Sequence, residues 1–199
     1  MGDHLTLGAD AYYKQARNLL DEGQFGSALI FAPFNYQKGY AEGVEFTGDY
    51  QNGAFSSYAN LALSRAMGKN VTSGQYNFGQ DDLDYIATHY VHLDHDQTYT
   101  GSAGAAYTFQ TVKYSADVLY GSGLRSGFAN TSHLAFYEQV NAAAEHTFDL
   151  GTAGPLDARL SIINLFDRIY EIRDGSGIGV FAPQYGPRRT FFVSLSKPF

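Results

Sequence analysis

The 199-residue sequence contains no cysteine and no tryptophan, and only 17% of its residues are charged. The lack of cysteine excludes disulfides and thiolate zinc sites, although it does not fix the cellular compartment. Lysine and arginine number 13 against 20 aspartates and glutamates, which gives a net charge of −7. Because no basic stripe is available to neutralise phosphates, we expect no nucleic-acid partner.

Long apolar runs are also missing from the sequence. No stretch comes near the roughly 20 consecutive apolar residues that a membrane-spanning helix needs. The opening residues MGDHLTLGADAYYK have neither the basic nor the apolar region of a signal peptide. One class of membrane protein escapes such a hydropathy scan, because the strands of transmembrane β-barrels alternate apolar and polar residues.

The sequence does contain 16 tyrosines, 15 phenylalanines and 22 glycines, and its apolar residues recur at every second position. This period indicates β-strands with two different faces. It predicts an all-β fold, an antiparallel up-and-down meander of eight strands at 4–13, 40–51, 54–67, 97–109, 112–121, 136–149, 157–167 and 188–199. We expect one face to carry Val112, Tyr114, Val118, Phe191, Val193 and Leu195, and the other Glu45, Asp49 and Asp117.

Short and long connections alternate along this predicted sheet. Short ones lie at 52–53, 110–111 and 150–156, and long ones at 14–38, 68–95, 122–135 and 168–187. All long loops then fall at one end, as in outer-membrane barrels. Aromatic residues near the strand ends would form interfacial girdles: Tyr12, Tyr13, Tyr50, Phe55, Tyr107, Phe109, Tyr120, Phe136, Tyr137 and Phe148. A soluble antiparallel barrel or sandwich also alternates, but a dry core would not accept unpaired polar residues on the inner face.

The last third of the chain, NLFDRIYEIRDGSGIGVFAPQYGPRRTFFVSLSKPF, resembles the end of TonB-dependent receptors of the Gram-negative outer membrane. The matching motif residues are Asn164, Leu165, Phe166, Asp167, Tyr170, Gly186, Pro187, Arg188, Arg189 and Phe199. The resemblance implies a segment of a transmembrane β-barrel. It also implies an outer-membrane location, contact with membrane lipid, and an assembly signal in the last strand, at Phe191, Val193, Leu195 and Phe199, that the barrel-assembly machinery recognises.

The same resemblance implies a 22-stranded barrel with an internal plug domain and a TonB-contacting segment, which 199 residues cannot hold. We therefore expect the whole chain, 1–199, to be the C-terminal portion of such a barrel, without plug domain or signal peptide. Contact with the TonB system would then occur only through the missing N-terminal part. The alternative is a self-standing eight-stranded barrel with a structural or adhesion role.

By the resemblance, the chain would form the wall and extracellular loops of an importer of ferric siderophores, haem, cobalamin or saccharides. This is transport of a small molecule, so we expect no enzyme and no cofactor. An outer-membrane hydrolase is a minor alternative, since no nucleophile motif such as G-x-S-x-G is present. Loops on a rigid barrel concentrate binding, and the expected ligand contacts are Tyr76, Phe78, Arg125 and Phe128.

Two acidic and histidine-rich stretches suggest metal sites. HYVHLDHD places His89, His92, His95 and Asp96 close in sequence, but in a strand His92 and His95 would point to opposite faces. The carboxylates of GQDDLDY, Asp81, Asp82 and Asp84, lack the pattern of an EF-hand loop. We therefore expect no metal site in either stretch.

Overall fold

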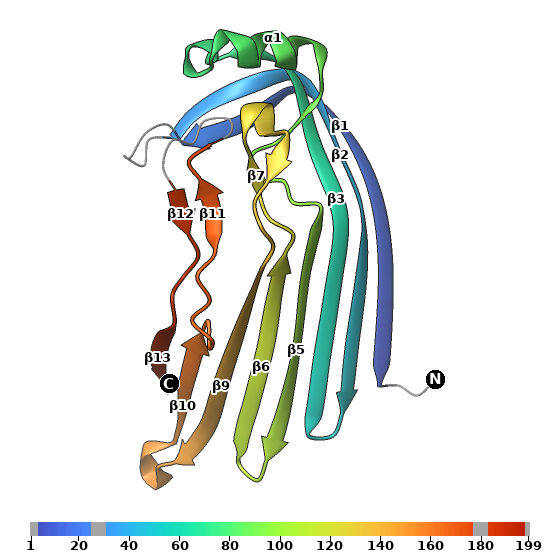
Figure 1. Ribbon diagram of the computed structural model, residues 1–199. Coiled ribbons are helices and arrows are strands. Elements are labelled where there is room, and N and C mark those ends of the chain that lie inside the picture. The colour runs from blue at the N-terminus through green and yellow to red at the C-terminus, as the bar shows by residue number, and fades with distance from the viewer. Residues whose placement is uncertain (1–3, 25–30, 177–182, 198–199) are drawn as a thin grey trace.

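The computed structural model describes residues 4–24, 31–176 and 183–197 of the chain. Eight main strands follow one another in a single antiparallel meander, as the sequence predicts. They are β1 (Leu5–Gln24), β2 (Phe31–Asn52), β3 (Phe55–Ser73), β5 (Tyr99–Phe109), β6 (Val112–Gly121), β9 (Tyr137–Asp149), β10 (Pro155–Ile163) and β13 (Thr190–Ser196). A short strand, β4 (Val91–His92), pairs antiparallel with the upper part of β3. The strands β1 and β13 lie at opposite edges of the sheet, so the described residues form an open, curved wall (Figure 1).

The connections segregate to the two ends of the wall as predicted (Figure 1). Tight turns join β2 to β3 and β5 to β6, and a 3-10 turn, η3 (Gly151–Ala153), lies between β9 and β10. The opposite end carries the helix α1 (Gln80–Thr88), the 3-10 turns η1 (Gln75–Asn77) and η2 (Phe128–Asn130), and two small hairpins. These hairpins pair β7 (Arg125–Ser126) with β8 (Ser132–His133), and β11 (Glu171–Asp174) with β12 (Pro183–Tyr185). No helix in the described part of the chain is long and apolar enough to cross a membrane.

The predicted loop 14–38 is wrong, because β1 and β2 continue far beyond the apolar segments. Their pairing runs on to Gln24 opposite Phe31. The apolar alternation fades in this region, but backbone hydrogen bonding does not depend on it. Similarly, β3 extends to Ser73, so the predicted loop 68–95 begins late and contains α1. β10 ends at Ile163, four residues before the predicted end, because Asn164 turns the chain with a φ of 51°.

Cross-strand register divides the residues of the wall between its two faces. One row crosses six strands through small and aliphatic residues: Leu7, Gly48, Ala59, Ala103, Val118 and Val140. The neighbouring row, one residue away on each strand, is mainly polar: Thr6, Asp49, Tyr58, Gly104, Asp117 and Asn141. The predicted separation of Asp49 and Asp117 from Val118 is therefore present. We call these the apolar face and the polar face.

The polar face bends over at the top of β1, β2 and β3. Asn18 and Asn70 adopt positive φ of 52° and 61° there, a conformation that asparagine tolerates. Above this kink the Tyr36 ring lies on Gly68, where a Cβ would come within 2.4 Å of the ring. Tyr36 is fully buried and joins the core beneath α1. The loops therefore close over the polar face, which is the inner face of the wall.

Aromatic rings gather at both ends of the apolar face. Near the short turns, Tyr50 contacts Phe55 with a centroid distance of 6.0 Å. Near the loops, Tyr13 stacks on Tyr40 at 6.1 Å. Two of the predicted girdle residues lie elsewhere: Tyr12 pairs with Gly43 on the polar face, and Tyr137 stacks on Tyr170 inside the loop end. Their position in sequence, one residue out of phase with the apolar row, accounts for this.

Candidate functional site

The loop end of the wall forms a compact cap, made of residues 74–98, 122–136, 164–176 and 183–189 over the tops of β1, β2 and β3. Its hydrophobic core joins strand and loop residues, with α1 contributing Ile86: Phe34, Tyr36, Val71, Ile86, Val91 and Ala129. Phe78 packs edge-on against Phe34 at a centroid distance of 4.8 Å. This core holds the loops in fixed positions on the wall.

Charged residues are buried next to this core. Asp94 and Arg173 are 3% and 5% exposed and form an ion pair between a loop after β4 and the hairpin strand β11. Arg173 Nη2 also lies 2.7 Å from His95 Nε2. A buried pair of this kind adds little net stability, but removing one partner is costly, since it leaves a charge without a partner. The pair therefore fixes β11 against the opposite side of the cap.

Asp96 organises a second buried group two residues further along. Its carboxylate accepts a hydrogen bond from the backbone N–H of Ala66 (3.1 Å) and forms an ion pair with Arg125 at 3.3 Å. His92 Nδ1 lies 2.5 Å from the same carboxylate, and Arg125 donates to Thr98 Oγ1 at 2.8 Å. Asp96 thus connects β3, β4 and β7.

The histidine-rich stretch therefore has a geometry that the sequence analysis did not foresee. Only His92 lies in a strand; His89 caps the end of α1, and His95 lies in a turn. Within residues 4–24, 31–176 and 183–197, no group of three or more histidine, aspartate or glutamate side chains is placed to hold a metal ion. The side chains of Asp94, His95 and Asp96 instead interact with arginines.

Burial shifts the pKa values of two carboxyl groups and one histidine in and next to the cap. It raises the pKa of Asp94 to about 6, while Arg173 acts in the opposite direction. Burial also raises the pKa of Asp21, near the top of β1, to about 6, and the charge of Asp94 adds to this. The pKa of His95 is lowered by burial and by Arg173. Asp21 Oδ1 accepts from the Glu22 N–H at 2.9 Å, but Oδ2 has no hydrogen-bond partner among the described residues, so the ionised form is only partly compensated.

The four residues predicted to contact ligand occupy different environments. The Tyr76 side chain, in η1, is 87% exposed, and Phe128, in η2, is about half exposed and contacts Tyr85. Phe78 belongs to the periphery of the cap core. Arg125 is 8% exposed and directed at Asp96. Ligand contact by these residues stays a prediction, and the structure leaves two of the rings, Tyr76 and Phe128, at the surface.

The motif residues of the last third come together in one structure, which we call the clip. The Asn164 side chain donates to the carbonyl oxygens of Arg168 and Pro187, both at 2.8 Å, and accepts from the Arg168 N–H at 2.9 Å. The Asp167 carboxylate receives two hydrogen bonds from the Arg188 guanidinium (2.8 and 2.6 Å) and one from the backbone N–H of Arg189 (3.0 Å). The clip thus ties the end of β10 to the start of β13.

A glycine completes the clip. The ring of Tyr170 lies where a Cβ of Gly186 would be, at 2.0 to 2.4 Å, so only glycine fits there. Among the remaining motif residues, Leu165 bonds through its backbone N–H to Val140, and the Phe166 side chain is 73% exposed. Phe199 lies outside the described residues.

A line of hydrogen bonds connects the clip to the polar face. The Tyr170 hydroxyl donates to Gln139 Oε1 (3.0 Å), and Gln139 donates to Asn141 Oδ1 (2.9 Å). Asn141 donates to Asp117 Oδ2 at 2.7 Å and accepts from the Asn164 N–H at 3.0 Å. The burial of Gln139 and Asn141 was not predicted from the sequence, although their place on the polar face of a predicted strand is a signal that could have indicated it.

Solved structures with this arrangement identify the fold. No family model matches the chain, and no curated protein matches it either. The siderophore receptor PiuA of Acinetobacter baumannii aligns over 97% of the chain and 26% of its own length, with a TM-score of 0.64 and 17% identity. The ferric-catecholate import receptor Fiu of Escherichia coli K12 aligns over 96% of the chain and 25% of its own length, with a TM-score of 0.63 and 17% identity.

The FrpB iron transporter of Neisseria meningitidis is similar over 98% of the chain and 29% of its own length, with a TM-score of 0.63 and 14% identity. These neighbours are TonB-dependent outer-membrane receptors. The chain has the fold of a TonB-dependent receptor barrel. It spans between a quarter and three tenths of the length of these three structures, and they are transport receptors and not enzymes.

The clip should contribute strongly to the stability of this receptor fold. Asn164→Ala removes the three hydrogen bonds of a buried side chain and places alanine at positive φ, so the free energy of unfolding should fall by about 2 to 4 kcal/mol. The measurement is the urea midpoint of the chain in detergent micelles. Asn60→Ala is the control: its exposed amide bonds only Ser102 Oγ, and its effect should stay within about 0.5 kcal/mol. Equal effects of the two variants would contradict a role for the clip.

The raised pKa of Asp21 should make the stability of the cap depend on pH. Because its pKa rises from 3.8 to about 6 on folding, the folded state binds the proton more tightly, and stability should fall as the pH rises from about 4 to about 6. Asp21→Asn is neutral throughout, so it should be more stable than the parent above pH 6 by about 1 to 3 kcal/mol.

The stability of the cap in the parent and the variant is measured by hydrogen exchange of the Tyr36 and Val71 amides at pH 5 and pH 8. Their exchange rates give the free energy of local opening of the cap. The lowered pKa of His95 contributes with the opposite sign, and the variant also loses the Asp21 charge that raises the pKa of His95. A difference that does not change between the two pH values would show that Asp21 keeps an ordinary pKa in the fold.

Proposed function

We propose that this chain forms part of the wall of an outer-membrane importer, with the cap outside the cell and the short turns in the periplasm. The observation that carries the proposal is the register of the two rows, which puts an apolar surface on one side of the whole sheet and a polar one on the other. In a barrel wall the apolar face meets lipid and the polar face lines the lumen. The structural neighbours support the same assignment.

The transported substrate is a small molecule. The neighbours are a siderophore receptor, a ferric-catecholate import receptor and an iron transporter, which favours a ferric siderophore over haem, cobalamin or a saccharide. Uptake would be coupled to the TonB system through receptor segments beyond this chain. Within the chain, the surface rings of Tyr76 and Phe128 would contact the substrate, with Phe78 and Arg125 supporting them from beneath.

The last strand carries the assembly function in this proposal. Phe191, Val193 and Leu195 pair with the apolar positions Ile162, Leu160 and Ala158 of β10, and all three are largely exposed. An exposed apolar strand at the edge of the wall supports the proposal that the barrel-assembly machinery recognises these residues together with Phe199.

Two adjacent positions test the membrane orientation. Val118→Asp places a charge on the apolar face and should cost roughly 2 kcal/mol in a lipid bilayer. Leu119→Asp adds the same charge on the polar face, where its neighbours are Ser102 and Gln139, and should be tolerated. The measurement is the amount of heat-modifiable protein in the outer-membrane fraction of a Gram-negative host. Equal amounts of both variants would contradict the proposed orientation.

The same assay tests the proposed assembly signal. Phe199→Ala should reduce the amount of assembled protein.

The substrate contact is tested in a complete homologous receptor that carries this chain in place of its own wall segment. Tyr76→Ala combined with Phe128→Ala should reduce uptake of a radiolabelled ferric siderophore about tenfold, since each ring contact contributes about 0.5 to 1.5 kcal/mol. Phe109→Ala combined with Phe148→Ala, at the short-turn end, removes two rings without touching the cap and should leave uptake unchanged. Normal uptake by the Tyr76 and Phe128 variant, with normal assembly, would show that these rings do not contact the substrate.

A further inference from the structure

The top of the cap is joined to the wall along a line where strand pairing is interrupted. The ladder between β1 and β2 skips Asn18 and Gln37, and the ladder between β2 and β3 skips Gln37 and Asn70. Side-chain amides bond at this level instead: Asn35 donates to the Asn18 carbonyl at 3.1 Å, and Asn70 donates to Gln37 Oε1 at 3.0 Å. We call Asn18, Gln37 and Asn70 the amide line. Because backbone hydrogen bonds of the ladder are missing there, the three strands resist bending less at this line than along the wall.

The chain above the amide line carries most of the hydrophobic core of the cap. We call residues 19–24, 31–36 and 71–88 the lobe; Figure 1 shows the tops of β1 and β2 curving over the wall beneath α1. Four of the six buried core residues belong to the lobe: Phe34, Tyr36, Val71 and Ile86. Val91 and Ala129 lie outside it. The lobe can therefore move as one packed body relative to the wall.

On the other side of the cap, residues 94–97 leave the strand that leads from β4 into β5. Leu93 and Thr98 still bond to β3 through their backbone, at 3.0 and 3.1 Å. Between them, Asp96 Oδ1 accepts the Ala66 N–H at 3.1 Å and replaces the missing backbone acceptor. The two buried ion pairs of the cap hold this bulge on β7 and β11, the side that the lobe does not include.

The lobe meets the bulge in a polar seam. Asp21 of the lobe lies close enough to Asp94 and His95 for their charges to shift its pKa, and the charges of Asp21 and Asp94 also act on the Tyr36 hydroxyl. Five of the six buried polar side-chain atoms that lack a hydrogen-bond partner in the described ranges belong to this seam: Asp21 Oδ2, Tyr36 Oη, Gln97 Oε1, Arg125 Nε and Arg173 Nε. Each has lost its hydration without gaining a bond, so the seam closes at a cost that rehydration would reduce.

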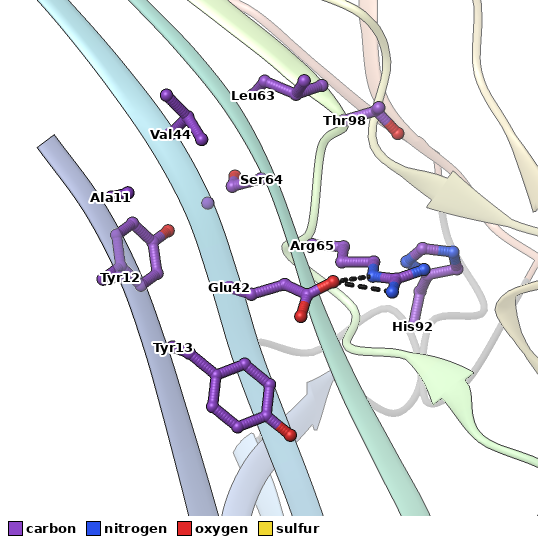
Figure 2. A pocket seen from close by; sticks show the side chains of 11 residues that line it. Ala11, Tyr12, Tyr13, Glu42, Val44, Leu63, Ser64, Arg65, His92 and Thr98 are labelled. Atoms are coloured by element: carbon purple, nitrogen blue, oxygen red, sulfur yellow. Dashed lines mark hydrogen bonds and ion pairs between the residues drawn. The ribbon is translucent and has the colours of Figure 1, made fainter. Parts of the chain in front are cut away.

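The wall below the amide line is hollowed next to the bulge. A groove of ≈ 600 Å³ lies there, lined by His92 and Thr98 at the two ends of the bulge and by residues of β1, β2 and β3. The Glu42–Arg65 ion pair, at 2.6 Å, is among its lining residues (Figure 2). A displacement of the bulge therefore meets open space on this side instead of packed side chains.

We propose that the lobe is a gate that swings about the amide line, away from the bulge, and uncovers the polar face beneath the cap. Asn18 and Asn70 absorb the bend, since asparagine tolerates the left-handed as well as the extended conformation. Hinges of domain movements are typically a few residues that take up such a change. The inference rests on the proposed function, because opening the gate admits a substrate only if the polar face lines the lumen of a barrel.

Distances between spin labels test the movement in the purified full chain in detergent micelles. Because the chain has no cysteine, labels attach only at introduced cysteines. Ala87→Cys on α1 combined with Ser132→Cys on β8 measures across the seam. Ala87→Cys combined with Glu22→Cys on β1 measures within the lobe, and all three positions are exposed.

Two populations of distance should occur across the seam and one within the lobe. Valine disfavours positive φ, so Asn18→Val combined with Asn70→Val should straighten the strands and raise the ratio of open to closed lobe about tenfold. Asn60→Val, on the wall part of β3, is the control and should leave the ratio unchanged. A single, identical distance across the seam in the parent and the Asn18 and Asn70 variant overturns the proposal, and so does an equal change of the distance within the lobe.

A disulfide across the seam tests the gate in the complete homologous receptor that carries this chain. The Ala129 N–H donates to Asp82 Oδ1 at 3.1 Å, so Asp82→Cys and Ala129→Cys are within reach of each other and join the lobe to η2. Oxidation should stop the uptake of a radiolabelled ferric siderophore, and reduction should restore it. Ser57→Cys combined with Ala105→Cys, two positions paired in the wall, is the control and should import in both states.

The two measurements separate this inference from the proposed function. Uptake by the oxidised Asp82 and Ala129 variant at the rate of its reduced form overturns the gate and leaves the proposed function standing. A reduced and assembled receptor that takes up no siderophore contradicts the proposed function, and the spin-label distances then decide by themselves whether the lobe moves.

Discussion

Each residue of the wall has only two directions in which to point, because successive side chains of a strand alternate between the faces of the sheet. A shift of one residue in the register would exchange the row of Leu7 and Val118 with the row of Asp49 and Asp117. In the proposed barrel, lipid on one side and a polar lumen on the other would then both meet the wrong side chains. The tight turns, such as Gly53 at a φ of 55° between β2 and β3, hold the register and hence both surfaces.

The cap uses a different principle. Its apolar core is small, and its loops are held by ion pairs that reach across long stretches of chain, with Arg173 meeting Asp94 and Arg125 meeting Asp96. Such pairs cost desolvation, so their main effect is to select one arrangement of the loops. In the proposed importer, loops fixed in this way would need less ordering when a substrate binds.

The clip fixes the edge strand of the wall. The clip holds β13 in the sheet by fixing the chain between Asn164 and Arg188, so the edge strand stays in register with β10.

The sequence by itself determined the meander, the two faces and the end that carries the loops, because period-2 alternation and turn residues such as Asn52-Gly53 act locally. The terminal motif could also be recognised, although its role as a clip could not. Only the tertiary structure decided that β1 and β2 continue beyond their apolar residues and that Arg125 is buried against Asp96. Each of these depends on which residues of distant segments come to lie opposite each other, and pairing over 20 to 80 residues leaves no local pattern in the sequence.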